Sequence, residues 1–361
     1  MSRIAIIDTE IDPNHIKNKA IEYIDLCGGG GEMSNALSHG TICAMVLEHC
    51  AVEYELVNIR IFQESIGKVF GELGLLCEAL KLCRDLRIDV VSLSAVTSIL
   101  SDSRHLFGTT NDLLESTIIV SALDNRRYMT VPTAYPHVIG VRNDSAGLLS
   151  PGDLAYSTND PYNANVFANC DFPFLRRCKH APSNSFAVPV VVSHINNLLN
   201  QGLPKQAVEA MIYNLKPYPL SEKFSCLDNS TVQTMREVPI VFVSADSANM
   251  TATLMDELYE KYKVQSSTLS LYDCPFDVRI KVLDDISGIK DDVRFMEKHY
   301  KTDLIFICGE QRHIETIRQI ISIDVELMYQ DNSEFIMCFE DKQELVPVVA
   351  LSDKLHEILT V

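Results

Sequence analysis

Short apolar runs alternate along the chain with longer segments in which apolar residues recur at the spacing of an α-helix. The first run, residues 3–8 (RIAIID), is typical of a strand buried on both faces of a parallel sheet. Similar runs predict strands at 54–60, 89–94, 116–123 and 136–141. Helical periodicity predicts helices at 39–50, 71–86 and 186–199. The alternation predicts an α/β fold with a doubly wound, mostly parallel sheet.

The same pattern restarts after residue 237. Strands are expected at 238–244, 303–308, 334–339 and 346–350, and helices at 250–263 and 311–321. Residues 216–237 hold two prolines, several Ser and Thr and few periodic apolar positions, as a linker does. We therefore predict a first domain over 1–215, a linker over 216–237 and a smaller, Rossmann-like α/β domain over 238–361.

Composition and charge narrow the class of protein. The 361 residues suit two domains, and 47% apolar with 22% charged residues excludes a disordered chain. A net charge of −18 disfavours binding to nucleic acid or to an anionic membrane surface. The sequence has no apolar run long enough to span a membrane and no signal-peptide pattern. Eleven cysteines without a regular framework are typical of free thiols in a reducing compartment, so we expect a cytoplasmic protein.

The second domain carries most of the acidic excess, with a net charge of −12 over residues 221–361 against −6 over 1–220. Its first strand leads into a helix, as in a phosphate-binding loop. Ser244 and Asn249 stand at the glycine positions of that loop, and Met250 stands at the lysine position. Because neither the backbone cradle nor the charge is present, we expect no nucleotide hydrolysis and no cofactor. The acidic surface favours a basic peptide or partner protein instead.

Three short motifs in the first half are candidates for chemistry. Asp8 ends the first strand, His39 opens a helix within Ser-His-Gly-Thr, and Ser185 stands at the start of the apolar helix. Taken singly, each has a structural explanation: a turn or cap, a core histidine, and an N-cap serine. Together they supply the nucleophile, the base and the orienting carboxylate of an acyl-transfer site.

A fourth element supplies the remaining requirement, a donor for the oxyanion. The strand at 117–123 ends in Asp124-Asn125, so the Asn125 amide is expected at the same edge of the sheet as the three other residues. It would act beside the backbone N–H of Ser185.

These motifs, in this order, resemble those of the subtilisin-like serine peptidases, the subtilases (S8-type). Asp8-Thr9, His39-Gly40-Thr41, Asn125 and Ser185-Phe186-Ala187-Val188-Pro189 match the family signatures over about residues 1–215. The resemblance implies a subtilisin-like fold, with Asp8, His39 and Ser185 as the catalytic triad and Asn125 in the oxyanion hole. It also implies that Ser94, Ala95 and Val96 bind substrate as an added strand and that Asp124 lines the pocket for the P1 side chain. No acidic cluster resembles a calcium loop, so we expect no metal.

Departures from the family pattern lie on the substrate side. Glu10, Asp124, Ser183-Asn184 and the segment 94–97 add side chains where the family keeps small residues. Asp124 would favour Lys or Arg at P1 if it points into the pocket, or would pair with Arg126 or Arg127 if it does not. The resemblance is to compact cytoplasmic subtilases, which implies a dedicated serine endopeptidase that matures a precursor by removing its leader peptide. The alternative is a catalytically weak or inactive peptide-binding scaffold on the same fold.

Overall fold

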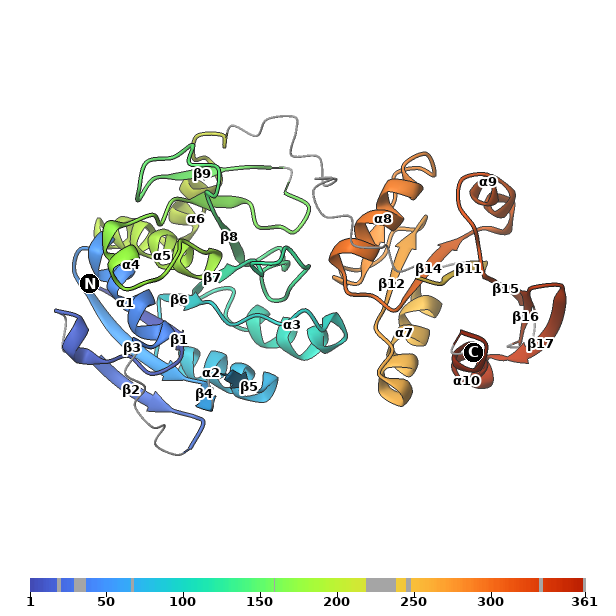
Figure 1. Ribbon diagram of the computed structural model, residues 1–361, viewed down its shortest axis with the longest axis horizontal. Coiled ribbons are helices and arrows are strands. Elements are labelled where there is room, and N and C mark those ends of the chain that lie inside the picture. The colour runs from blue at the N-terminus through green and yellow to red at the C-terminus, as the bar shows by residue number, and fades with distance from the viewer. Residues whose placement is uncertain are drawn as a thin grey trace. The chain divides into compact units, whose positions relative to one another are not determined.

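The computed structural model describes residues 1–17, 21–28, 37–65, 68–158, 160–218, 238–244, 248–330 and 334–359. The chain forms two compact units, one made of Met1–Thr97 with Asp102–Lys223 and the other of Ser98–Ser101 with Phe224–Val361 (Figure 1). Of the expected linker, only 216–218 is described, and the remainder, 219–237, lies outside the described residues. Pro217 pairs with Tyr156 and Tyr218 is buried, so this short piece packs on the first unit.

The first unit is built on an eight-stranded sheet with the order β2-β3-β1-β6-β7-β8-β10-β9. All its neighbouring strands are parallel except β9, which runs antiparallel to β10. The strands are β1 (Ser2–Asp8), β2 (Ile21–Asp25), β3 (Tyr54–Arg60), β6 (Val90–Leu93), β7 (Ile118–Ala122), β8 (Ile139–Asn143), β9 (Leu154–Tyr156) and β10 (Val166–Ala168). A separate hairpin joins β4 (Phe62–Ser65) to β5 (Lys68–Gly71).

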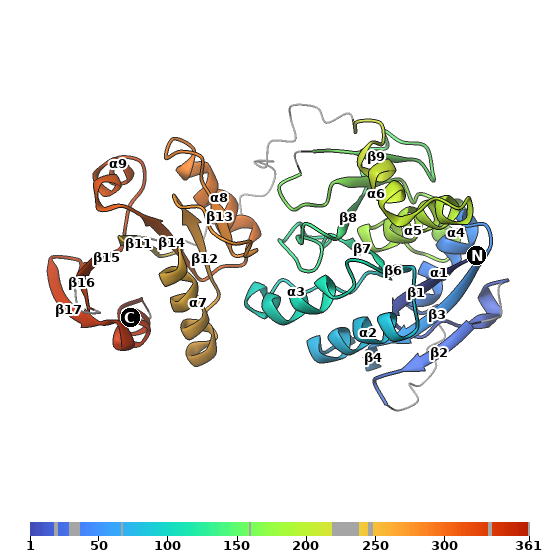
Figure 2. The ribbon, with the colours of Figure 1, turned by 180° about the vertical axis from the view of Figure 1, so that it is seen from behind.

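Helices cover both faces of this sheet, which confirms the predicted doubly wound architecture. Figures 1 and 2 show α1 and α5 on one side of the strands and α2 and α3 on the other. The helices are α1 (His39–Cys50), α2 (Leu73–Asp85), α3 (Ser103–Asn111), α4 (Pro173–Arg177), α5 (Asn184–Asn200) and α6 (Lys205–Tyr213), with 3₁₀ turns η1 (Pro13–His15) and η2 (Leu100–Asp102). Helix α5 packs against α1 and crosses β6, β7 and β8, and its apolar face is buried along the core.

The second unit holds a seven-stranded sheet with the order β13-β12-β14-β11-β15-β16-β17. The first five strands in that order are parallel, and β16 and β17 add an antiparallel edge. Its strands are β11 (Ile240–Ser244), β12 (Ser266–Ser270), β13 (Ile280–Val282), β14 (Leu304–Gly309), β15 (Val325–Gln330), β16 (Glu334–Phe339) and β17 (Lys342–Pro347). Its helices are α7 (Asn249–Tyr262), α8 (Ile289–His299), α9 (Ile314–Arg318) and α10 (Leu351–Leu359), with 3₁₀ turns η3 (Gln311–His313) and η4 (Val348–Ala350).

Two predicted elements of this unit are wrong in their bounds. The strand expected at 346–350 is the last part of β17 followed by η4. The chain leaves the sheet at Pro347, whose ring fixes φ near −61° and which has no N–H to continue the ladder. The helix expected at 311–321 is a 3₁₀ turn followed by α9, which ends at Arg318.

No helix among the described residues is long and apolar enough to cross a membrane. The ten cysteines of the described ranges are all free thiols, and Cys43, Cys83, Cys170 and Cys308 are buried. The prediction of unpaired cysteines is therefore confirmed for this part of the chain.

Candidate active site

The candidate residues gather at one edge of the first sheet. Asp8 is the last residue of β1, Ser94 follows β6 and Asn125 follows β7 by three residues. Strands β1, β6 and β7 are adjacent and parallel, so their carboxyl ends meet at this edge. His39 and Ser185 come from the first turns of α1 and α5, the two helices that pack together on one face.

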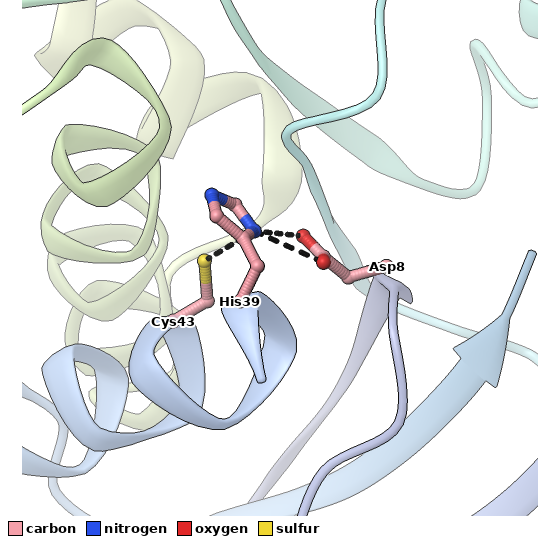
Figure 3. A group of neighbouring side chains, drawn as sticks. All are labelled: Asp8, His39 and Cys43. Carbon is pink, nitrogen blue, oxygen red and sulfur yellow. Dashed lines mark hydrogen bonds and ion pairs between the residues drawn. The ribbon is translucent and has the colours of Figure 1, made fainter. Parts of the chain in front are cut away.

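Asp8 and His39 form the best-defined contact of the site. The two Asp8 carboxylate oxygens lie 3.0 and 2.9 Å from His39 Nδ1, and Figure 3 shows Nε2 on the far side of the ring. Asp8 is buried, and its carboxylate also accepts the Thr9 N–H at 2.7 Å. A carboxylate held in this way fixes the histidine with the proton on Nδ1, and Nε2 is left as the acceptor.

Gly40 permits the close approach of α1 to the end of β1. A Cβ at position 40 would lie 2.5 Å from the Thr9 carbonyl oxygen. The Gly40 N–H donates to Thr9 Oγ1 at 2.8 Å, and the Ser38 side chain caps the helix by accepting the Thr41 N–H. This packing places His39 within reach of Asp8.

A buried side chain of β3 forms hydrogen bonds to the loop after Asp8. Asn58 is fully buried, and its amide donates to the carbonyl oxygens of Ile6 and Thr9 while its Oδ1 accepts the Ile11 N–H at 3.0 Å. Asn58 thus satisfies the backbone groups released where the strand ends. It was not foreseen from the sequence, because a single Asn inside a strand-like run carries no distinctive signal.

The electrostatics of the pair make the His39 imidazole more basic than a free histidine. Burial alone would lower the pKa of His39, but the neighbouring Asp8 carboxylate outweighs it, so the pKa of His39 is raised above its ordinary value. The nearby Cys43 is fully buried, and this burial raises the pKa of its thiol. Cys43 is therefore a neutral thiol near pH 7, and Asp8 is the negative charge that acts on the imidazole.

Ser185 lies in the first turn of α5, where helix N–H groups have no partner within the helix. The cap residue Ser183 accepts the Phe186 N–H, while the Ser185 N–H donates to no atom of the described residues. The Phe186 ring stacks on the His39 ring, with centroids 5.2 Å apart, so α5 and the imidazole are in contact. Among the described residues, Ser185 Oγ makes no hydrogen bond to His39.

Asn125 is fixed through Asn184, the first residue of α5. Asn125 Oδ1 accepts the Asn184 N–H at 3.0 Å, which leaves the exposed amide NH₂ of Asn125 free to donate. The Asn184 side chain donates to the carbonyl oxygens of Leu123 and Asp124 at 3.0 and 3.4 Å and accepts the Asn143 N–H at 2.9 Å. The expectation that Asn184 adds bulk to the cleft is therefore wrong: its side chain faces the ends of β7 and β8 and joins them to α5.

The segment after β6 is extended and has one unoccupied edge. Thr97 exchanges two backbone hydrogen bonds with Val131, at 3.0 and 2.9 Å. Because successive residues of a strand direct their N–H and C=O to opposite sides, the backbone groups of Val96 face away from Val131. They have no partner among the described residues. Ser94 donates its hydroxyl to the Ser185 carbonyl oxygen at 3.3 Å, and Ala95 is buried.

Asp124 forms hydrogen bonds and an ion pair with Arg126. Its Oδ1 accepts the Arg126 N–H at 2.7 Å and the Arg126 Nε at 3.3 Å, and its Oδ2 lies 3.3 Å from Nη2. The Arg126 guanidinium lies 5.3 Å from the centroid of the Tyr128 ring. Of the two sequence-based interpretations of Asp124, this geometry matches pairing with Arg126.

No family model matches the chain, and no curated protein matches it. Solved structures similar to it include a cold-adapted subtilisin-like serine proteinase at 15% identity and TM-score 0.43, over 59% of this chain and 81% of that one. A lanthipeptide protease is similar at 13% identity and TM-score 0.43, over 58% and 79%. The prenylagaramide maturation protease PagA is similar at 16% identity and TM-score 0.38, over 55% and 76%.

Proposed function

We propose that the first unit is a serine endopeptidase of the subtilase type that matures a precursor peptide. The observation that carries this proposal is the buried Asp8–His39 pair, with Nδ1 bound to the carboxylate and the histidine ring stacked on the residue that follows Ser185. Ser185 attacks the scissile carbonyl, and His39 Nε2 takes its proton and later returns it to the leaving amine.

Two donors would stabilise the oxyanion that forms in this step. One is the Ser185 N–H in the first turn of α5, and the other is the Asn125 side-chain NH₂, whose orientation is set by the bond from Asn184 N–H to its Oδ1. The dipole of α5 adds a partial positive charge at the same place. Helix α5 fixes the Ser185 N–H, and the bond from the Asn184 N–H fixes the Asn125 side chain, which reduces the cost of orienting both donors during the reaction.

Substrate would bind as an extended strand along the unoccupied edge at Val96. Main-chain hydrogen bonds of this kind give affinity without selecting a sequence, and side-chain pockets give selectivity. Because Arg126 neutralises Asp124, a basic P1 residue gains little from that carboxylate. A precursor peptide as substrate follows the motif resemblance, and a cytoplasmic location stays a prediction, as does a basic peptide or partner protein for the second unit.

Labelling by a fluorophosphonate probe tests the proposal. The wild type should be labelled at one site, and Ser185→Ala should abolish the label. Ser193→Ala is the matched control, since Ser193 lies on the same helix, is buried, and donates to the Val190 carbonyl within it at 2.7 Å. A folded wild-type protein that takes up no label would contradict the proposal.

A second candidate function is a peptide-binding scaffold without efficient catalysis. The observation that favours it is that Ser185 Oγ makes no hydrogen bond to His39 among the described residues, although such bonds are often long before substrate binds. A precursor peptide that binds tightly, remains uncut over a long incubation and leaves Ser185 unlabelled would support this alternative over the peptidase.

A further inference from the structure

The sheet of the second unit ends in a hairpin whose last strand, β17, has no neighbour on its free side among the described strands. Figures 1 and 2 show this hairpin at one edge of the unit's sheet. Phe339 and Lys342 are paired across the two-residue turn Glu340-Asp341, so they exchange both backbone hydrogen bonds, and bonded pairs recur at every second residue. The N–H and C=O groups of Gln343 and Leu345 therefore point away from β16, and they have no partner among the described residues.

A row of apolar side chains crosses the sheet beside this free edge. Leu345 is paired with Ile336, and Ile336 is paired with Met328, so the three side chains lie next to one another on one face. Leu345 is 55% exposed, and Ile336 and Met328 are only partly buried. A free strand edge beside an exposed apolar face is suited to pairing with an extended segment of another chain.

The surroundings of β17 are acidic. Residues 334–361, which include β16, β17 and α10, carry six acidic residues against two lysines, a net charge of −4. The acidic residues are Glu334, Glu340, Asp341, Glu344, Asp353 and Glu357, and the lysines are Lys342 and Lys354. Beside the free edge, Lys354 Nζ lies 3.2 Å from Glu344 and 3.4 Å from Glu357, so one ammonium group is shared by two exposed carboxylates. The remaining negative charge favours a segment with basic side chains.

A second copy of this chain fits the edge poorly. It would bring the same negative charge to the contact. In a two-fold arrangement that pairs Gln343 with the Leu345 of the second copy, the two Glu344 side chains would stand directly opposite each other. Like charges in that position destabilise a sheet.

We propose that β17 is a docking edge for an extended basic peptide, which adds to the sheet as a further strand. The outward N–H and C=O groups of Gln343 and Leu345 bond to its main chain. Its alternate side chains fall on opposite faces: apolar ones cover Leu345 and Ile336, and Lys or Arg side chains lie beside Glu344. The edge thus recognises alternating apolar and basic residues. Delivery of a precursor peptide by this edge rests on the proposed peptidase function, but the binding itself does not.

Binding is measured with the full chain carrying Ser185→Ala, so that no peptide is cut. A display library of random linear peptides is selected on this protein, and the most enriched peptide is made with a fluorescent label for anisotropy titration. It should carry alternating apolar and basic residues, and its affinity should fall as salt is added. The same peptide with Glu in place of each basic residue should not bind.

Two variants of the Ser185→Ala protein locate the binding on β17. Gln343→Pro removes an outward N–H without removing a bond of the hairpin, and edge strands accept proline at such positions. It should weaken binding at least about fivefold, whereas the matched control Gln343→Ala keeps the N–H and should bind as the parent protein does. Leu345→Lys changes the face and its charge but not the backbone, and it should weaken binding as well.

Equal affinity of the parent protein, Gln343→Pro and Leu345→Lys for the selected peptide would overturn the proposal, as would a selection that enriches no peptide with the alternating pattern. Self-association that Gln343→Pro abolishes, seen as a concentration-dependent mass, would assign the edge to a second copy instead. Loss of peptide binding in both variants, with no fluorophosphonate labelling of the wild type, would uphold the docking edge while the peptidase proposal fails.

Discussion

Replacing Asn184 by alanine should weaken catalysis through Asn125 rather than through any contact of its own with substrate. The Asn184 side chain makes three hydrogen bonds, two to the carbonyl oxygens that precede Asn125 and one from the Asn143 N–H. Removing them leaves the bond from the Asn184 N–H to Asn125 Oδ1 as the connection between α5 and the loop after β7. The Asn125 amide is then held less firmly toward the oxyanion, and a small displacement of this donor raises the activation barrier.

The strength of these bonds sets how much stability and how much rate Asn184→Ala should lose. Two of them, at 2.9 and 3.0 Å, are well formed, and the third, at 3.4 Å, is weak. At about 1 kcal/mol for each good bond, Asn184→Ala should lower the free energy of unfolding by about 2–3 kcal/mol. For a unit of this size the midpoint of thermal unfolding should fall by roughly 4–12 °C. Losing the oxyanion donor completely would cost roughly 10²–10³ in rate, so partial loss should cost about 10–100-fold.

The assay is the rate constant for phosphonylation of Ser185, because the phosphoryl oxygen of the probe occupies the same hole as a peptide oxyanion. Asn200→Ala is the matched control on the opposite end of α5. Its side chain also makes three hydrogen bonds, from the Ser2 N–H at 2.9 Å, to the Glu53 carbonyl at 2.6 Å and to Asn196 Oδ1 at 3.4 Å. The two variants should be destabilised equally, and only Asn184→Ala should be slowed.

A double-mutant cycle separates an indirect from a direct role. If Asn184 acts through Asn125, the double variant should react no more slowly than Asn125→Ala alone. If the two effects on the rate multiply, or if Asn200→Ala is slowed as much as Asn184→Ala, the reasoning is refuted.

Three further predictions concern the neighbouring residues. Gly40→Ala should lower the free energy of unfolding by about 1–3 kcal/mol in denaturant titrations, because the added Cβ would stand 2.5 Å from the Thr9 carbonyl oxygen, and it should also slow labelling. The labelling rate should rise with pH through an apparent pKa above 6.5, the ordinary value for histidine. The reason is that the raised pKa of His39 keeps its imidazole protonated, and so unable to act as the base, until a higher pH is reached. A rate that levels off below pH 6.5 would contradict this. Asp124→Asn should leave the P1 preference in a peptide library unchanged, since Arg126 already binds that carboxylate; a selective loss for basic P1 residues would show that the pair opens.

The sequence predicts best those elements whose burial produces a regular pattern of apolar residues. Helix α1 and strand β3 occupy the predicted residues because seven of the twelve positions of α1 and six of the seven positions of β3 are buried. Strand β2 was missed because it is an edge strand with three of its five residues exposed, so it lacks the apolar run of a central strand. Strand β12 was missed because its sequence, SSTLS, is mostly hydroxyl side chains, although all five are buried. In both, tertiary position rather than local pattern decides the structure.

For the candidate site, the sequence predicted the reacting residues but not the residues that hold them in position. Asp8, His39 and Ser185 were found because their residue types and chain order are rare in combination, whereas Asn184 was misread as bulk in the cleft. Its role depends on which way one side chain turns, toward the ends of β7 and β8, and that direction follows only from the packing of α5 on the sheet. Cys43 is the opposite case. Its position one turn after His39 was visible in the sequence, since residues four apart share a helix face. What the spacing could not reveal is that Asp8 approaches the same nitrogen, so a buried thiol that looks like ordinary core contacts the imidazole of the Asp8–His39 pair.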